Sequence, residues 1–63
     1  MALLFVTWDG RWRIESTRAG NAFTVVERHP DGHVQTRLAN VSLAEAGVFL
    51  AERGVEPDEL RPA

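Results

Sequence analysis

The sequence predicts an α+β domain, in which an antiparallel meander of three or four β-strands carries one C-terminal α-helix packed on one face. Two turn signals, Asp9-Gly10 and Pro30-Asp31-Gly32, each separate two runs of strand-forming residues and predict two β-hairpins. A helix entry signal, Ser42-Leu43-Ala44-Glu45, follows the second hairpin within a few residues. The helix and this hairpin are therefore expected to pack as one unit.

The length of 63 residues allows a single domain, residues 1–63. A domain this small buries only about 60 % of its unfolded surface, so disulfides, a metal or oligomerisation usually add stability. The chain contains no cysteine, which excludes disulfides and thiolate metal sites. The apolar residues 1–6 are too few to cross a membrane, and they lack the basic segment of a signal peptide. We therefore expect a cytoplasmic protein with no membrane contact.

The first hairpin is predicted from residues 3–8 and residues 11–16, which are rich in strand-forming side chains. If Asp9-Gly10 is the whole loop, Phe5 lies opposite Ile14 and Trp8 lies opposite Arg11. This register divides the side chains between two faces of the sheet. The face under the helix is expected to carry Leu3, Phe5, Trp12 and Ile14. The face away from the helix, called the outer face below, is expected to carry Leu4, Val6, Trp8, Arg11 and Arg13.

The second hairpin is predicted from residues 23–28 and 33–38, joined by the three-residue loop Pro30-Asp31-Gly32. This loop places Val26 opposite Thr36 and Val25 opposite Arg37. Alternate residues of the second strand, namely Val34, Thr36 and Leu38, are less polar than their neighbours, so they are expected to face the helix with Thr24 and Val26. The outer face is then expected to carry Phe23, Val25, Gln35 and Arg37, with Glu27.

The helix is predicted over residues 43–53. Ser42 and Glu45 form a capping box at its start, and Gly54 is the expected left-handed cap at its end. Gly47 lies at the centre of the most apolar arc, together with Leu43 and Leu50, and is expected to let the helix approach the sheet closely. Residues 56–60 predict a short extra turn, and residues 61–63 are expected to fray.

The charged residues are distributed unevenly along the chain. The formal net charge is −2, so attraction of the whole protein to nucleic acid or anionic lipid is not expected. Residues 1–40 hold five arginines and four acidic residues, whereas residues 41–63 hold two arginines and five acidic residues. The basic residues are therefore concentrated in the part of the chain that carries the two hairpins.

Two histidines flank the second turn and are the candidate metal ligands. His29 and His33 face each other, with Asp31 between them, and imidazole and carboxylate groups are zinc ligands. The interpretation we favour is a pair of solvated histidines at a hairpin tip, with no metal and no cofactor. The only serines are Ser16 and Ser42, and Ser42 is needed as the helix cap, so nucleophilic catalysis has no support. The chain is not expected to be an enzyme.

Three strands followed by a capped helix, with arginines in the middle strands, resemble the DNA-binding domains made of a three-stranded sheet and one helix. These include AP2-type domains and the arm-binding domains of phage integrases. The resemblance covers residues 11–53 and depends on Arg11-Trp12-Arg13, the turn at residues 29–32 and the helix entry at residues 41–46. In that family the outer face of the sheet lies in the major groove. Carried over by position, the resemblance implies DNA contacts from Arg11, Arg13, Gln35 and Arg37, with Trp8 beside them.

Two functions follow from the predicted outer face. In the first, the protein is a non-enzymatic regulatory module that forms a homodimer or binds a protein partner, because exposed apolar patches mark interaction surfaces and Trp and Arg are typical of interface hot spots. In the alternative, the same face binds DNA. A third interpretation is that the first strand folds differently and the patch is core. The predicted binding residues are Leu4, Val6, Trp8, Arg11, Arg13, Phe23, Val25, Gln35 and Arg37.

Overall fold

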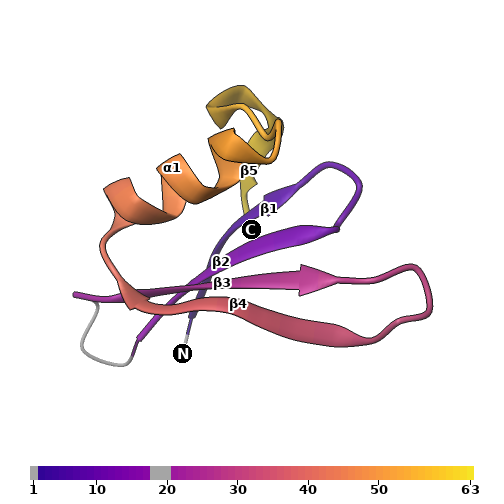
Figure 1. The fold of residues 1–63 in the computed structure, drawn as a ribbon, viewed down its shortest axis with the longest axis horizontal. Coiled ribbons are helices and arrows are strands. Elements are labelled where there is room, and N and C mark those ends of the chain that lie inside the picture. Colours follow the sequence, from indigo (N-terminus) through magenta and orange to yellow (C-terminus); the bar gives the residue numbers. More distant parts are fainter. Residues whose placement is uncertain (1, 18–20) are drawn as a thin grey trace.

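The computed structural model describes the backbone of residues 2–17 and 21–63, and the side chains of residues 4–17 and 21–63 (Figure 1). The described elements, in chain order, are β1 (Ala2–Thr7), β2 (Trp12–Ser16), β3 (Phe23–Arg28), β4 (Val34–Val41), α1 (Leu43–Glu52), the 3-10 turn η1 (Pro57–Glu59) and β5 (Leu60–Pro62). The strands form one antiparallel sheet in the order β4-β3-β2-β1-β5. The predicted α+β class is confirmed. The prediction of three or four strands with a C-terminal helix is wrong, because a fifth strand follows the helix.

The fifth strand forms from the segment that was expected to fray. Leu60 pairs with Thr7 and Arg61 pairs with Val6, and the amide of Ala63 donates to the carbonyl of Leu4 at 3.1 Å. The short turn predicted before it is present as η1 and directs the chain back along β1. β1 is therefore an interior strand between β2 and β5. Both edges of β1 are therefore hydrogen-bonded within the sheet.

The first hairpin has the predicted register on the turn side of Leu4, with Phe5 opposite Ile14, and the register shifts by one residue at Leu4. The predicted pair of Trp8 and Arg11 lies outside the two strands, which end at Thr7 and begin at Trp12. The turn of this hairpin is held by side chains as well as backbone. The hydroxyl of Thr7 donates to Asp9 Oδ1 at 2.7 Å and accepts the amide of Trp12 at 3.1 Å. Gly10 has a φ of +74°, which is the left-handed conformation that glycine adopts without strain. The turn signal at Asp9-Gly10 therefore predicted both the position and the register of this hairpin.

The second hairpin also has the predicted register near its turn, with Val26 opposite Thr36 and His29 bonded to His33 through the backbone. Further along, Val25 pairs with Leu38 rather than with Arg37. β4 therefore contains an extra residue at Arg37, which is a β-bulge, and a second extra residue between Leu38 and Val41.

The predicted faces of this hairpin are wrong. Val25 is fully buried in the core beneath α1, and Phe23 packs against the same core. Gln35, opposite Glu27, and Arg37, which bonds to Glu27, also lie on the helix side. The physical reason is the bulge at Arg37. Its extra residue places both Arg37 and Leu38 on the helix side, so the alternation of side chains in β4 is interrupted there. The residues that were expected to face the helix, and that lie instead on the outer face, are Thr24, Val26, Val34 and Thr36.

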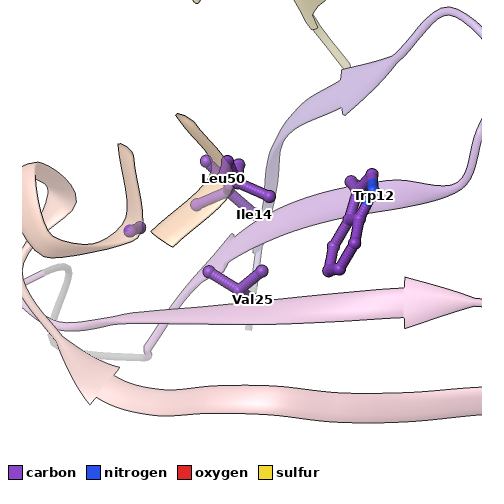
Figure 2. Packing of buried hydrophobic residues seen from close by; sticks show 5 residues of the cluster. Trp12, Ile14, Val25 and Leu50 are labelled. Atoms are coloured by element: carbon purple, nitrogen blue, oxygen red, sulfur yellow. The ribbon is translucent and has the colours of Figure 1, made fainter. Parts of the chain in front are cut away.

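The core forms between α1 and the middle of the sheet. Figure 2 shows Leu50 of α1 beside Ile14 of β2, with Val25 below them and Trp12 further along β2. Ala46 completes this cluster. The buried side of α1 is therefore centred on Ala46 and Leu50. The prediction that Gly47 allows close approach is wrong, because a Cβ at Gly47 would meet no atom within 4 Å.

The helix begins and ends as predicted, within one residue. Ser42 accepts the amide of Glu45 at 3.1 Å, and Glu45 accepts the amide of Ser42 at 3.1 Å, so the capping box is complete. Gly54 follows the helix with a φ of +81°. No helix in the described ranges is long and apolar enough to cross a bilayer.

Ser42→Ala is expected to reduce the free energy of unfolding by about 1 kcal/mol, because the amide of Glu45 loses its acceptor. Ser42→Thr, which keeps a hydroxyl at the cap, is the matched control and is expected to change stability by less than about half as much. Chemical denaturation followed by circular dichroism measures both. Equal stability of Ser42→Ala and the wild type would show that this cap does not stabilise the helix.

Candidate functional site

The outer face of the sheet carries a row of directly paired residues that crosses all five strands. Val6 lies between Arg13 and Arg61, and Arg13 also pairs with Val26. Directly paired residues of an antiparallel sheet share a face. Val6 follows Phe5, which packs on the core, so the row lies on the side away from α1 (Figure 1). From β5 to β4 the row is Arg61, Val6, Arg13, Val26 and Thr36.

Arg13 lies in the middle of this row. Its Nε atom is buried and has no hydrogen-bond partner among the described residues. Its neighbour Val26 is only 5 % exposed although no helix covers the outer face. The side chain of Arg13 therefore lies along the sheet and shields apolar surface with its stem, as long basic side chains commonly do.

Two more arginines extend the outer face toward the turn of the first hairpin. Arg28 follows the inward-facing Glu27, and its Nη2 lies 3.0 Å from the position that a Cβ at Gly10 would occupy. The guanidinium carbon of Arg61 lies 5.1 Å from the centroid of the Trp8 ring. Trp8 itself is 73 % exposed. An exposed aromatic ring thus lies at the border of the face, in contact with a cation.

Charge is segregated between the two sides of the sheet. Within the described part of the chain, every ion pair is made to Glu27, so Arg13, Arg28 and Arg61 have no carboxylate partner there. In the described strands, the one acidic residue on the outer face is Glu15, opposite Thr24. The other described acids besides Glu27 lie in turns, in α1 or after it; they are Asp9, Asp31, Glu45, Glu52, Glu56, Asp58 and Glu59. The outer face is therefore basic although the chain has a net charge of −2.

The structure brings together only part of the predicted binding surface. Val6 and Arg13 lie on the outer face as predicted, and Trp8 lies at its border. Leu4 is the extra residue of a bulge in β1 and is half-buried. The other predicted residues lie on the helix side or bond to Glu27 there; they are Arg11, Phe23, Val25, Gln35 and Arg37. The predicted apolar patch is therefore not assembled, because Phe23 and Val25 belong to the core.

Sequence reasoning missed Arg28 and Arg61 as members of the outer face. Arg28 alternates with Glu27, so the correct choice of face for β3 would have found it. Arg61 lies in a segment of three residues that is too short to show a strand pattern. Only its pairing with Val6 in the folded sheet assigns it to the face.

The helix side carries a buried charge network around Glu27, whose side chain is 2 % exposed. Arg11 donates to Glu27 Oε2 from Nε at 2.9 Å and from Nη2 at 2.7 Å. Arg37 donates from Nη1 to Glu27 Oε1 at 2.6 Å. His29 Nε2 lies 3.8 Å from the same oxygen. Both carboxylate oxygens thus have charged donors, which is the condition under which a buried carboxylate is tolerated.

Hydrogen bonding decides the ionisation of Glu27. The donors of Arg11, and then that of Arg37, lower the pKa of Glu27 below its ordinary value of 4.5, whereas burial acts in the opposite direction. The net shift is downward, so the carboxylate is ionised at neutral pH. The inward-facing acid on β3 is therefore a structural anion, and this explains why polar residues were acceptable on the helix side of the second hairpin.

The two histidines pack against each other, with ring centroids 5.0 Å apart. His29 Nε2 lies 3.0 Å from Gln35 Oε1. Asp31 accepts the backbone amide of His33 at 2.9 Å, which closes the turn. Across residues 2–17 and 21–63, no group of three or more His, Cys, Asp or Glu side chains is arranged to hold a metal ion. The contacts of His29 and His33 are those of a hairpin tip.

Comparison with known proteins adds no assignment. No family model, curated protein or solved structure matches the chain. The candidate site is therefore argued from its own geometry and charge.

Proposed function

We propose that the protein is a cytoplasmic, non-enzymatic binding module that binds duplex DNA through the outer face of its sheet. One observation carries the proposal. Three arginines of the sheet, Arg13, Arg28 and Arg61, have no carboxylate partner among the described residues and share the face that α1 leaves uncovered. Phosphate groups are bound by such unpaired guanidinium groups.

The acidic residues support one orientation of the protein on DNA. They lie mainly in α1, in the C-terminal segment and at the hairpin turns, so these segments disfavour close approach of the phosphate backbone of a duplex. The outer face, with three arginines and Glu15, is attracted to them. A protein of net charge −2 can therefore bind a polyanion in a single orientation, with weak non-specific affinity.

The resemblance to three-stranded DNA-binding domains is compatible with this proposal. Residues 11–53, which carry the resemblance, contain β2, β3, β4 and α1 in the expected order. The residues proposed to contact DNA differ from those carried over by position. They are Arg13, Arg28 and Arg61, with Trp8 at the border, and they exclude Arg11, Gln35 and Arg37.

A protein partner on the same face is the second candidate. Trp8 is 73 % exposed and Val34, opposite Arg28, is 50 % exposed, so the face offers apolar as well as basic contacts. A homodimer with these faces in direct apposition would oppose arginines of like charge across the two-fold axis. An acidic protein surface therefore fits the face better than a second copy does.

Fluorescence anisotropy with a labelled duplex tests the DNA proposal. Three phosphate contacts predict that the logarithm of the binding constant falls with the logarithm of salt concentration with a slope of about −2.7. Arg13→Gln and Arg61→Gln are each expected to weaken binding and to reduce the magnitude of this slope by about 1. The affinity is best measured near about 50 mM salt, where phosphate contacts contribute most.

Arg53→Gln is the matched control, because Arg53 lies at the end of α1 and the substitution removes the same charge from the helix side. It is expected to leave the affinity for DNA within about twofold, since long-range charge effects are screened beyond about 10 Å. Equal weakening by all three substitutions would indicate non-specific charge attraction. No binding by the wild type at low salt would exclude DNA and leave the protein partner, for which light scattering and capture of acidic proteins are the next measurements.

A further inference from the structure

We infer that the helix side of the protein contains a second, independent site, which binds a phosphate group as the dianion. The site lies where the end of α1 meets β2, β3 and β4. Arg11, Arg37 and Arg53 line a cavity of about 210 Å³ there, together with Trp12 and Glu27. This group of three arginines is called the arginine cluster below.

Two aromatic rings hold the arginine cluster in position. Trp12 and Phe49 pack edge to face with their centroids 6.0 Å apart. The guanidinium carbon of Arg53 lies 3.5 Å from the centroid of Phe49, and that of Arg37 lies 5.9 Å from it. Arg11 lies 5.5 Å from the centroid of Trp12. The three cations are therefore arranged around a rigid apolar base.

The charge of the cavity is not balanced by its own residues. Three arginines and one glutamate give it a net charge of +2, and Glu27 is bonded to Arg11 and Arg37 only. The adjacent hollow is lined by Asp9 and Glu59 as well as by Arg11 and Arg53, so its own charges balance and the excess positive charge belongs to the cavity. A phosphate monoester carries a charge of about −1.5 to −2 at neutral pH. A bound phosphate monoester would therefore neutralise the net positive charge of the cavity.

Each arginine also retains unused donors. Arg11 bonds to Glu27 through Nε and Nη2, Arg37 bonds through Nη1, and Arg53 donates from Nη1 to the carbonyl of Phe49. A guanidinium group has five N–H donors, so several on each side chain remain for a ligand. Glu27 acts as a positioning residue, because its two oxygens hold Arg11 and Arg37 on opposite sides of one carboxylate.

The size of the cavity limits the ligand. Sites for complete small molecules are usually larger than about 300 Å³, so this cavity suits one phosphate group and leaves the rest of an ester outside. The adjacent hollow, which shares Arg11, Trp12 and Arg53 with the cavity, would receive that remainder. The ligand is therefore inorganic phosphate or the terminal phosphate of an ester.

Isothermal titration calorimetry of the full chain tests the site with three probes at constant ionic strength and about pH 7.5, where phosphate is largely the dianion. The probes are inorganic phosphate, a nucleoside 5′-monophosphate and a phosphoserine peptide. Saturable binding of inorganic phosphate supports the site with free phosphate as a ligand. Saturable binding of an ester alone supports the site and assigns it to that ester. Absence of saturable binding by all three overturns the inference.

Arg53→Gln decides whether binding occurs at the arginine cluster, because Arg53 forms no ion pair with Glu27 in the described structure. It is expected to weaken binding by about tenfold or more, as loss of a charge-assisted hydrogen bond does. Arg61→Gln, on the outer face, is expected to leave phosphate binding within about twofold, because Arg61 lines neither the cavity nor the adjacent hollow. Equal weakening by both variants would overturn the site. Far-UV circular dichroism verifies that Arg53→Gln is folded.

The proposal of DNA binding and the proposal of phosphate binding can be refuted independently. Arg61→Gln is expected to weaken DNA binding and spare phosphate binding, whereas Arg53→Gln is expected to do the reverse. Phosphate binding without DNA binding would leave the arginine cluster as the functional site of the protein.

Discussion

Replacing Arg11 and Arg37 together by methionine is expected to reduce the free energy of unfolding by about 3–5 kcal/mol. The double variant keeps the apolar stems but leaves the carboxylate of Glu27 buried without a charged donor, apart from His29 at 3.8 Å. A buried charge without a partner is among the most destabilising single features in a protein. Urea denaturation followed by tryptophan fluorescence measures the change.

Adding Glu27→Gln to this double variant is the control. It removes the buried charge, so it is expected to recover at least about half of the lost stability. Glu27→Gln alone is expected to be less destabilising than the double variant, since Arg11 and Arg37 can then turn their guanidinium groups to solvent. If the triple variant were less stable than the double variant, the network around Glu27 would not act as a compensated charge.

The pH dependence has opposite signs in the wild type and the double variant. The pKa of Glu27 is lowered in the folded wild type, so its contribution to stability is present above the ordinary value of 4.5 and is lost as pH falls through the folded pKa. In the double variant the largest lowering causes are removed, so burial outweighs the remaining effect of His29 and raises the pKa, and stability is expected to increase as pH falls toward 4.5. Comparison with Glu27→Gln at each pH removes the contribution of other groups.

Leu50→Ala is expected to reduce stability by about 2–5 kcal/mol. Leu50 is fully buried against Ile14 and Val25 at the centre of the core, so its truncation removes contacts on several sides and leaves a cavity (Figure 2). A chain of this length has a total stability of roughly 3–9 kcal/mol. A large part of the molecules is therefore expected to be unfolded at 37 °C, and far-UV circular dichroism over a range of temperature measures that fraction.

Val48→Ala is the matched control on the same helix. Val48 is largely exposed, so its truncation is expected to change stability by less than about 0.5 kcal/mol. Similar losses at Leu50 and Val48 would show that α1 does not pack through the side that carries Ala46 and Leu50.

Local signals in the sequence predicted the connections of this fold well. Asp9-Gly10 and Pro30-Asp31-Gly32 gave both hairpins and their registers near the turns, because the loop length sets which residues are paired. Ser42 and Glu45 gave the first residue of the helix through a capping box that is complete in the structure. These features depend only on neighbouring residues.

The face of the second hairpin could not be predicted in the same way. Glu27 and Arg37 look like outward-facing residues in the sequence, and only the ion pair between β3 and β4, with Arg11 from the first hairpin, makes them acceptable on the helix side. The bulge at Arg37 has no sequence signal, yet it moves Leu38 into the core. Side chains alternate along a strand. Choosing the wrong face for β4 therefore exchanged the predicted inner and outer residues of β3.

The prediction of which residues lie on the outer face depended on the same choice of face for the second hairpin. Val6 and Arg13 were assigned correctly because they lie between the turn of the first hairpin and the bulge at Leu4, whereas Arg28 was missed with β3. Arg61 required β5, whose pairing with β1 has no signal in three residues of sequence. Long-range pairing therefore limits what the sequence alone can predict about the outer face.

The most direct test of DNA binding by the outer face is a titration of the ¹⁵N-labelled protein with a short duplex, followed by NMR at low salt. Because the row from Arg61 to Thr36 is proposed to face the phosphates, the largest changes are expected at the backbone amides of Val6, Arg13 and Arg61 and at the Nε–H groups of Arg13, Arg28 and Arg61. The amides of α1 are expected to change little. Changes concentrated in α1 or around Arg53, with the outer face unaffected, would contradict DNA binding through the outer face.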